Sequence, residues 1–216
     1  MTITTNPTGP AANDRRSRGG DRREQILDVA LQLFAQHGMA QVSTRQIAQA
    51  VGISQPSLYA HFASAHEISA ELCLRAFAGL AEASRRVLAE PASPREHFYR
   101  LGRAYIDFGL THPDMYRLAF MQETDPAVAE LVQQGKDPVL AAGQGAFDML
   151  REVLARVLGR STEEIEIQAQ SIWASVHGLT SLLIARPMFP WADREALIAH
   201  HLEAVCALYQ PDADPR

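Results

Sequence analysis

The residues best suited to chemical recognition lie in the stretch STRQIAQAVGISQPSLYAHF, residues 43–62. Its second half carries uncharged side chains at positions that helical spacing leaves exposed or at the rim. Amide, hydroxyl and imidazole groups in such a place hydrogen-bond to base edges and phosphates, and glutamine can pair with adenine through both amide atoms. The stretch therefore predicts a surface that binds duplex DNA, formed by Gln55, Pro56, Ser57, Tyr59 and His61.

Two short helices joined by a tight turn are expected to position these groups. Ser43 and Gln46, three residues apart, form a capping box at which the first helix begins. Gly52 ends that helix in the left-handed conformation, and Ser54 caps a second helix whose first turn accommodates Pro56. This spacing is typical of a helix-turn-helix, although an ordinary helical corner that binds nothing has the same outline.

Two further groups are expected to meet the DNA backbone. Ser43, Thr44 and Arg45 begin the first motif helix, where backbone amides and one positive charge suit phosphate. Residues 1–20 lack a hydrophobic period and should form a disordered basic arm that reaches phosphates or a minor groove. A solvated tail is the alternative. The arginines of the arm and of the first turn behind it are Arg15, Arg16, Arg18, Arg22 and Arg23.

Charge and composition narrow the class of protein. The chain has 216 residues, 47% hydrophobic, with a net charge of −5, which argues against a protein that coats nucleic acid through bulk charge. The charge is unevenly distributed. Residues 1–62 contain six arginines and four acidic residues, a net charge of +2, so the rest of the chain carries −7. A mildly basic end on an acidic body would orient a DNA binder electrostatically.

The remaining sequence signals concern the compartment. No signal peptide and no apolar run of about 20 residues is present, so we expect a cytoplasmic protein without a membrane partner. Cys73 and Cys206 lack metal-type spacing and are expected to be buried free thiols, with a redox switch as the alternative. No metal site, cofactor or catalytic residue is predicted.

The rest of the chain has helical patterning, and no strand or repeat is predicted. The expected fold is all-α with about ten helices, among them a long helix from a second capping box at Ser64 to Glu90. Later helices are expected over 94–110, 113–120, after Asp125-Pro126, over 138–158, from a capping box at Ser161 to 185, and over 193–209. Gly143 and Gly145 in one of these indicate either close helix contact or room for a ligand.

The passage from Arg22 to Leu74 resembles the N-terminal DNA-binding domain of the TetR family of bacterial transcriptional regulators. The resemblance runs through ILDVALQLFAQHG, STRQIAQAVGIS and SLYAHF in the family's order and spacing. Trp173-x-x-x-His177-Gly178 resembles the signature of one group of the family's C-terminal domains, as does Tyr116-Arg-Leu-Ala-Phe120. One departure is clear: the lysine usual at the start of the family's fourth helix is Ala65 here, so that phosphate contact cannot be carried over.

The resemblance implies an N-terminal three-helix head, joined by a long helix to a C-terminal helical body. The implied ranges are a basic arm at 1–20, a DNA-binding domain at 21–81, an effector-binding and dimerisation domain at 82–210, and a tail at 211–216. It further implies a homodimer through the last two long helices, 162–185 and 193–209, that binds a palindromic operator in double-stranded DNA and most commonly represses.

A small-molecule effector of unknown identity is also implied. Its pocket is expected to draw on Met115, Phe120, Phe147, Trp173 and His177, and the alternative is that these residues are ordinary core. The effector could bind better to a conformation of the C-terminal body in which the helix from Ser64 to Glu90 is swung. Its binding would then change the spacing of the two recognition helices in the dimer.

Two rival functions remain at this level. One is a dimeric DNA-binding protein without an effector. The other is an all-helical enzyme, although the body shows no spaced nucleophile, base and orienter, and adjacent His200 and His201 cannot face one site from a helix.

Overall fold

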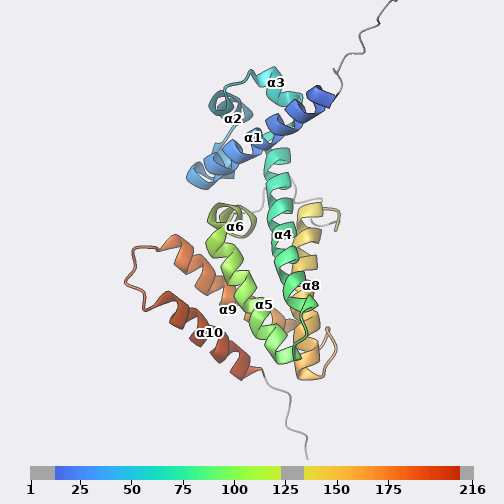
Figure 1. Ribbon diagram of the computed structural model, residues 1–216, viewed down its shortest axis with the longest axis vertical. Coiled ribbons are helices and arrows are strands. Elements are labelled where there is room, and N and C mark those ends of the chain that lie inside the picture. Colours follow the sequence, from blue (N-terminus) through green and yellow to red (C-terminus); the bar gives the residue numbers. More distant parts are fainter. Residues whose placement is uncertain (1–12, 123–133, 210–216) are drawn as a thin grey trace, which may run out of the picture. The chain divides into compact units, whose positions relative to one another are not determined.

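The computed structural model describes residues 13–122 and 134–209, and in these ranges all regular structure is helical, with nine α-helices and one short 3-10 helix (Figure 1). The predicted all-α fold is confirmed. The chain forms two compact units, one ending at Ser69 and one starting at Ala70. Helix α4 (Ala65–Ala89) begins in the first unit and continues into the second. This divide lies within an unbroken helix, so no loop marks it in the sequence.

The first unit contains α1 (Asn13–His37), η1 (Met39–Gln41), α2 (Thr44–Val51) and α3 (Gln55–Tyr59). Its core comes from regularly spaced apolar residues, including Ile26, Phe34, Ile47, Leu58 and Phe62, each at most 1% exposed. These side chains fix the angle between α1 and the two motif helices, so burial rather than the turn alone sets the motif's geometry.

The start of α1 corrects one expectation. The helix begins at Asn13, so the backbone of Arg15, Arg16 and Arg18 is helical and the disordered arm expected over 1–20 does not extend through these residues. Arginine, glutamate and glutamine are good helix formers, and extending an existing helix adds one hydrogen bond for each residue fixed. Residues 1–12 lie outside the described part of the chain.

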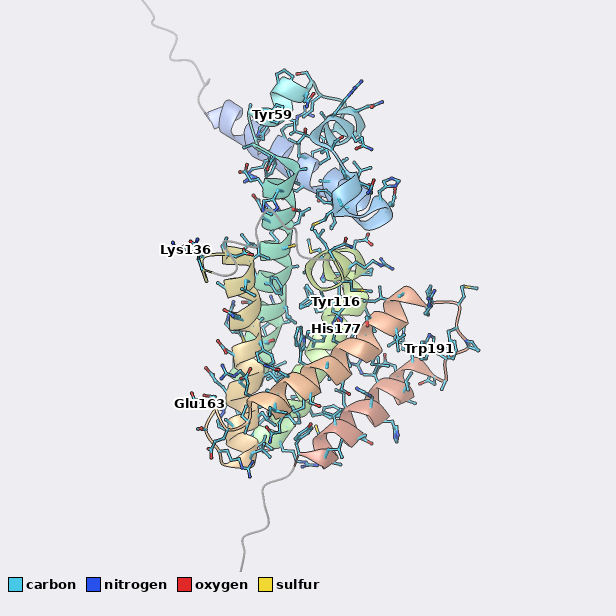
Figure 2. All side chains as sticks on the ribbon, turned by 180° about the vertical axis from the view of Figure 1, so that it is seen from behind. Tyr59, Tyr116, Lys136, Glu163, His177 and Trp191 are labelled. Atoms are coloured by element: carbon cyan, nitrogen blue, oxygen red, sulfur yellow. The ribbon has the colours of Figure 1, made fainter. Side chains whose placement is uncertain are left out.

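The second unit is organised around α5 (Pro94–Thr111), against which α8 (Pro138–Leu158), α9 (Glu166–Ala185) and α10 (Arg194–Leu208) pack. Helix α6 (Pro113–Phe120) follows α5 after a single residue. Figure 2 shows Tyr116 of α6 and His177 of α9 close together within this unit. The close approach of α5 and α10 depends on Gly102, because a Cβ atom there would lie 2.6 Å from a methyl carbon of Leu202.

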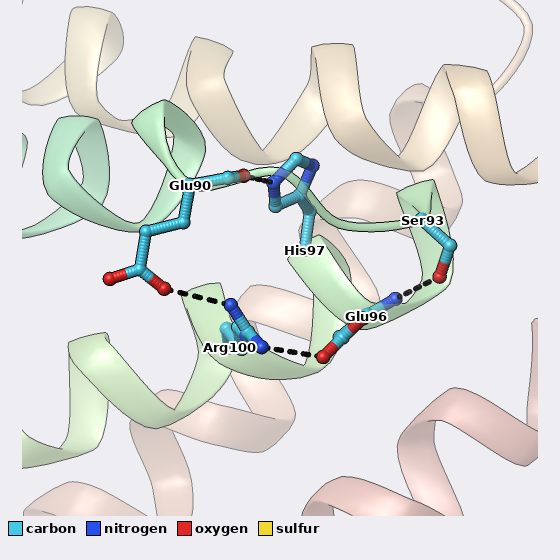
Figure 3. Close-up of polar contacts among 5 residues, drawn as sticks. All are labelled: Glu90, Ser93, Glu96, His97 and Arg100. Atoms are coloured by element: carbon cyan, nitrogen blue, oxygen red, sulfur yellow. Dashed lines mark hydrogen bonds and ion pairs between the residues drawn. The ribbon is translucent and has the colours of Figure 1, made fainter.

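A polar corner joins α4 to α5 (Figure 3). The Ser93 hydroxyl accepts a hydrogen bond from the Glu96 amide at 3.2 Å and caps α5. Arg100 bridges the carboxylates of Glu90 and Glu96 at 2.9 and 2.5 Å, and the His97 ring contacts the Glu90 carbonyl at 2.9 Å. The corner therefore satisfies carbonyl and carboxylate groups where the chain leaves one helix for the next.

The helix expected from Ser161 starts later than predicted. The capping box forms only in part: the Ser161 amide donates to the Glu164 carboxylate at 2.9 Å, but α9 begins at Glu166 with Ile165 as its N-cap. Ile165 is fully buried, so packing rather than a capping side chain sets the start of α9. The helix expected after Asp125-Pro126 falls within residues 123–133, which lie outside the described ranges.

Candidate functional site

The N-terminus of α2 is held by the predicted capping box. The Ser43 hydroxyl accepts from the Gln46 amide at 3.3 Å, and the Gln46 side-chain oxygen accepts from the Ser43 amide at 2.8 Å. At the other end Gly52 takes φ 76°, the left-handed conformation that lets the chain turn into α3. Thr44 and exposed Arg45 thus stand on a fixed first turn, which can present them to a phosphate.

Helix α3 is short and is positioned by both of its ends. Ser54 accepts from the Ser57 amide at 3.2 Å, and proline occupies the first turn, as predicted. Leu58, fully buried, anchors the helix to the core, and the Phe62 amide donates to the Leu58 carbonyl at 3.0 Å just beyond the helix. This leaves Pro56 and Ser57 exposed on the outer side and His61 partly buried.

Three polar side chains meet between α2 and α3, and we call Thr44, Gln55 and Tyr59 the recognition triad. Gln55 Nε2 lies 3.2 Å from the Tyr59 hydroxyl and 3.4 Å from Thr44 Oγ1, and those two oxygens are 3.2 Å apart. Tyr59, labelled in Figure 2, is 49% exposed, and hydrogen bonds from Thr44 and then Gln55 lower its pKa. The sequence predicted all three as contacts but gave no sign that they bond to one another.

The arginines expected to form a DNA-binding arm have separate surroundings. The guanidinium of Arg23 lies 4.1 Å from the centroid of the Phe62 ring, a cation–π contact inside the first unit. Arg22 donates to the Gln25 side chain at 2.7 Å on the surface. The side chains of Arg15, Arg16 and Arg18 lie outside the described part of the structure. Arg23 therefore contributes to packing within the first unit. The sequence had predicted only a DNA contact for this residue.

The start of α4 bears on the family's missing lysine. Ala65 is the first helical residue, the Ser64 hydroxyl accepts from the Glu67 amide at 3.0 Å, and the Glu67 carboxylate accepts from the Ala63 amide at 2.6 Å. A neutral residue thus stands where the lysine is usual, and a carboxylate is bonded beside it. The Ser64 cap satisfies the Glu67 amide, and the Glu67 carboxylate places a negative charge at this end of the helix, which disfavours a phosphate contact at this point.

A second polar group lies inside the second unit. The Tyr116 hydroxyl is 2.6 Å from His177 Nδ1 and 3.1 Å from the Tyr105 hydroxyl, and Tyr105 is 3.2 Å from the same His177 nitrogen. The Trp173 indole donates to the Tyr105 hydroxyl at 3.2 Å. Ring contacts extend this set, and we call the whole the aromatic cluster: Tyr105, Tyr116, Phe120, Phe147, Trp173 and His177.

The polar atoms of the aromatic cluster are neutral near pH 7. Burial raises the pKa of Tyr105 to about 12 and also raises that of Tyr116, because desolvation disfavours the phenolate. Burial also lowers the pKa of His177. The cluster thus offers hydroxyl, imidazole and indole hydrogen-bonding groups without formal charge.

Four of the five predicted effector residues belong to this cluster, and the fifth does not. Among the residues that the structure describes, Met115 makes no ring contact or side-chain hydrogen bond with the cluster, but it packs against the apolar core of Ala76, Leu80 and Phe108 that also contains Tyr116. Tyr105 was missed by sequence reasoning, because a lone tyrosine in a helical pattern is typical of core. Its hydroxyl becomes informative only when folding brings α5 against α9.

An open groove lies between α4 and α5, with a volume of about 490 Å³. Phe108, Gly79, Ala83 and Ala104 give it an apolar lining, and charged and polar side chains from both helices border it. None of the five predicted effector residues lines this groove. Phe108 also packs with Tyr116 in the neighbouring core, so one ring borders both the groove and the aromatic cluster.

The two glycines singled out in α8 differ. A Cβ atom at Gly143 would lie 3.2 Å from the Phe77 ring, so this glycine serves close contact between α8 and α4. A Cβ atom at Gly145 would meet nothing within 4 Å. Helix contact therefore explains Gly143 and not Gly145.

The outer sides of α9 and α10 keep apolar residues in solvent. Ile167 is 82%, Leu182 51% and Leu208 78% exposed. His201 Nε2 lies 3.3 Å from the Ser175 hydroxyl and ties the two helices together, and burial lowers the pKa of His201. Exposed apolar residues along a pair of packed helices are typical of a protein interface.

Both cysteines are buried free thiols, as predicted, and burial raises the pKa of Cys73 to about 11. A thiol with so high a pKa holds little of the nucleophilic thiolate near neutral pH, which disfavours the redox alternative at Cys73. In the ranges that the structure covers, none of the helices has the length and apolarity needed to cross a bilayer.

Two models of protein-family domains match different parts of the chain. Residues 26–72 match the model of "Bacterial regulatory proteins, tetR family", and residues 98–205 match that of "Tetracyclin repressor-like, C-terminal domain". Among solved structures, PfmR from Thermus thermophilus has a TM-score of 0.66 at 23% identity, covering 84% of this chain and 97% of that one. The fatty acid degradation regulator FadR from Bacillus halodurans has a TM-score of 0.69 at 17% identity, covering 93% and 97%. At such identities these two structures establish the fold alone.

Two relatives extend the comparison in sequence. The transcriptional activator FasR of Mycolicibacterium smegmatis is 29% identical over 146 residues, 65% of each chain. The transcriptional repressor KstR2 of Rhodococcus jostii is 43% identical over 70 residues, 32% of this chain and 33% of its own. The chain thus spans less than two thirds of either relative. Since models of both family domains match in order along a chain with the matching fold, this protein belongs to the TetR family of bacterial transcriptional regulators.

Proposed function

We propose that this protein is a ligand-responsive transcriptional repressor that binds a palindromic operator as a homodimer. The observation that carries the proposal is the helix-turn-helix of the first unit, in which two capped helices place the half-buried Thr44 and Gln55 beside exposed Tyr59, Arg45 and Ser57. Repression is the commoner mode in the family, and KstR2 is named a repressor. FasR is named an activator, so a promoter assay has to decide the sign.

DNA contacts in this proposal divide by chemistry. Arg45 and the amides that begin α2 hold phosphate, while Gln55 and Ser57 read base edges. Tyr59 and His61 stand at the rim of the same surface. The helical arginines Arg15, Arg16 and Arg18 are candidates for backbone contact outside the motif.

The dimer in this proposal forms through α9 and α10. The exposed apolar residues Ile167, Leu182 and Leu208 support this face, since burying them against a second copy removes them from water. Leu182→Glu should convert the dimer to monomer in sedimentation equilibrium and abolish cooperative binding to an inverted repeat. A monomeric wild-type protein would contradict the dimer.

The effector site in this proposal is the aromatic cluster. Its support is the gathering of four sequence-predicted residues around neutral hydrogen-bonding groups, with Trp173 41% exposed at one side. The chain has two tryptophans, so Trp191→Phe leaves Trp173 as a single reporter. A compound that binds the cluster should change the fluorescence of Trp173 and raise the melting temperature of the protein. The groove between α4 and α5 is the competing position. If the compound binds there, Ala104→Trp should weaken its binding.

The test of the whole proposal is selection of binding sites from random duplex DNA with the full-length protein. We expect an inverted repeat with half-site centres about 34–36 Å apart, or a multiple, as a symmetric helix-turn-helix dimer requires. Failure to enrich any sequence would overturn sequence-specific binding. Screening compounds for release of the selected DNA then separates an effector-responsive regulator from a dimer that binds DNA without one.

A further inference from the structure

The recognition triad restricts what Gln55 can offer to DNA. A glutamine side chain has two amide hydrogens to donate and one oxygen that accepts. In this structure the amide nitrogen faces two oxygens at once, the Tyr59 hydroxyl at 3.2 Å and Thr44 Oγ1 at 3.4 Å. The amide nitrogen therefore faces the protein, and the side-chain oxygen is left as the group available to a base.

The arrangement is held from both sides. Thr44 stands on the first turn of α2, which the Ser43–Gln46 capping box fixes, and α3 is fixed by the Ser54 cap and by buried Leu58. Gln55 and Tyr59 are four residues apart on α3, so their side chains share one face. The Thr44 and Tyr59 oxygens also lie within 3.2 Å of each other, which closes the triangle. Such a preformed network loses little side-chain freedom on binding DNA.

We propose that Thr44 and Tyr59 position Gln55 as a reader that only accepts hydrogen bonds, so that it selects, on the strand it contacts, a base whose own edge carries an exocyclic amine. In the major groove adenine N6 and cytosine N4 donate, whereas guanine and thymine present acceptors. The usual glutamine–adenine pair also needs a donor to adenine N7, and the triad withholds that donor. Gln55 should therefore accept adenine and cytosine about equally, where a free glutamine prefers adenine. This inference rests on the proposed binding of duplex DNA.

The experiment compares full-length variants by site selection from random DNA, followed by competition binding with the four bases at one position. Gln55→Ala identifies the position, since base preference should disappear there. The wild type should prefer adenine and cytosine at that position over guanine and thymine. A wild-type preference for guanine or thymine would overturn the inference, because it requires the amide nitrogen to face the base.

Tyr59→Phe is the decisive variant. It keeps the ring but removes one partner of the Gln55 amide, so the freed hydrogen can reach adenine N7. Adenine should then exceed cytosine by about 5-fold or more, as expected for a bidentate base contact. A uniform loss of affinity with unchanged base preference would mean that the Tyr59 hydroxyl serves only as a phosphate contact, and would overturn the positioning role.

Thr44 supplies a matched pair of variants. Thr44→Val removes the hydroxyl at nearly constant shape and should shift preference toward adenine, as Tyr59→Phe does. Thr44→Ser keeps the hydroxyl and should retain the wild-type preference. Equal preferences in the valine and serine variants would contradict the proposal. An inverted repeat enriched by the wild type alongside unchanged variants would refute this inference alone, whereas no enrichment at all would refute the proposed function.

Discussion

The recognition triad and the aromatic cluster use similar chemical groups in opposite surroundings. Each contains at least one tyrosine hydroxyl bonded to a nitrogen-bearing side chain, but Tyr59 is 49% exposed while Tyr116 is fully buried. Hydrogen bonds lower the pKa of Tyr59, whereas burial raises the pKa of Tyr105 and Tyr116. Exposure to solvent, rather than the bonding groups themselves, therefore decides the direction in which the tyrosine pKa moves in each network.

Truncating the buried tyrosine should have the largest effect. Tyr116→Ala removes a fully buried ring that touches Tyr105, Phe120 and His177, and should lower the free energy of unfolding by about 3–5 kcal/mol. Denaturant unfolding at fixed protein concentration measures it. Tyr59→Ala is the control and should leave unfolding close to wild type, since its ring is half in solvent. Equal losses from both variants would mean that the two networks do not differ in this way.

A pair of glycine substitutions tests how tightly the cluster is packed. A Cβ atom at Gly109 would lie 2.5 Å from a Thr180 methyl carbon and 2.9 Å from the Tyr116 ring. Gly109→Ala should therefore destabilise the protein by about 1–3 kcal/mol through overpacking. Gly145→Ala meets no atom within 4 Å in a helix interior. That substitution should stabilise by about 0.5–1 kcal/mol. Thermal melts of the two variants should move in opposite directions.

A charge change on the exposed surface should alter DNA binding and leave folding nearly unchanged. Arg45→Ala removes one positive charge from the first turn of α2, so affinity should fall alike for all DNA sequences. The slope of log affinity against log salt should flatten by about 1. Binding titrations at several salt concentrations give the slope. An altered base preference with an unchanged salt slope would show that Arg45 reads bases instead.

The smallest expected effect is a pH dependence of stability from His177. Burial lowers its pKa in the folded protein below the ordinary value of 6.5, so the unfolded chain binds more protons in the window just below that value. The stabilising contribution is complete above about pH 6.5, falls as the pH drops through it, and levels off below the folded pKa. Denaturation of wild type and His177→Gln at about pH 7.5 and about pH 5.5, above and below the ordinary pKa of histidine, isolates the contribution of His177. His201, whose pKa is also lowered, remains in both proteins. If the difference in the free energy of unfolding between wild type and His177→Gln is the same at both pH values, the predicted contribution of His177 is contradicted.

Much of the first unit could be predicted because its signals are local. The Ser43–Gln46 capping box, the Gly52 turn and the Ser54 cap each involve atoms within four residues, and all three form as predicted. The helices expected over 94–110 and 193–209 also begin close to the predicted positions, at Pro94 with Ser93 as its cap and at Arg194 with Asp193 as its cap. The local signal failed at Ser161, where burial of Ile165 outweighed a local cap, and at Asn13, where an existing helix extended into a polar segment.

What the sequence alone determined about this protein is its helical periodicity, its caps and the spacing of the helix-turn-helix, since neighbouring residues carry that information. Only the tertiary structure decided which side chains meet: that Thr44 and Tyr59 hold Gln55, that Arg23 stacks on Phe62, and that Tyr105 joins His177. Most of those contacts join residues far apart in the chain. Their distances depend on how buried apolar faces orient whole helices, and no local pattern contains that geometry.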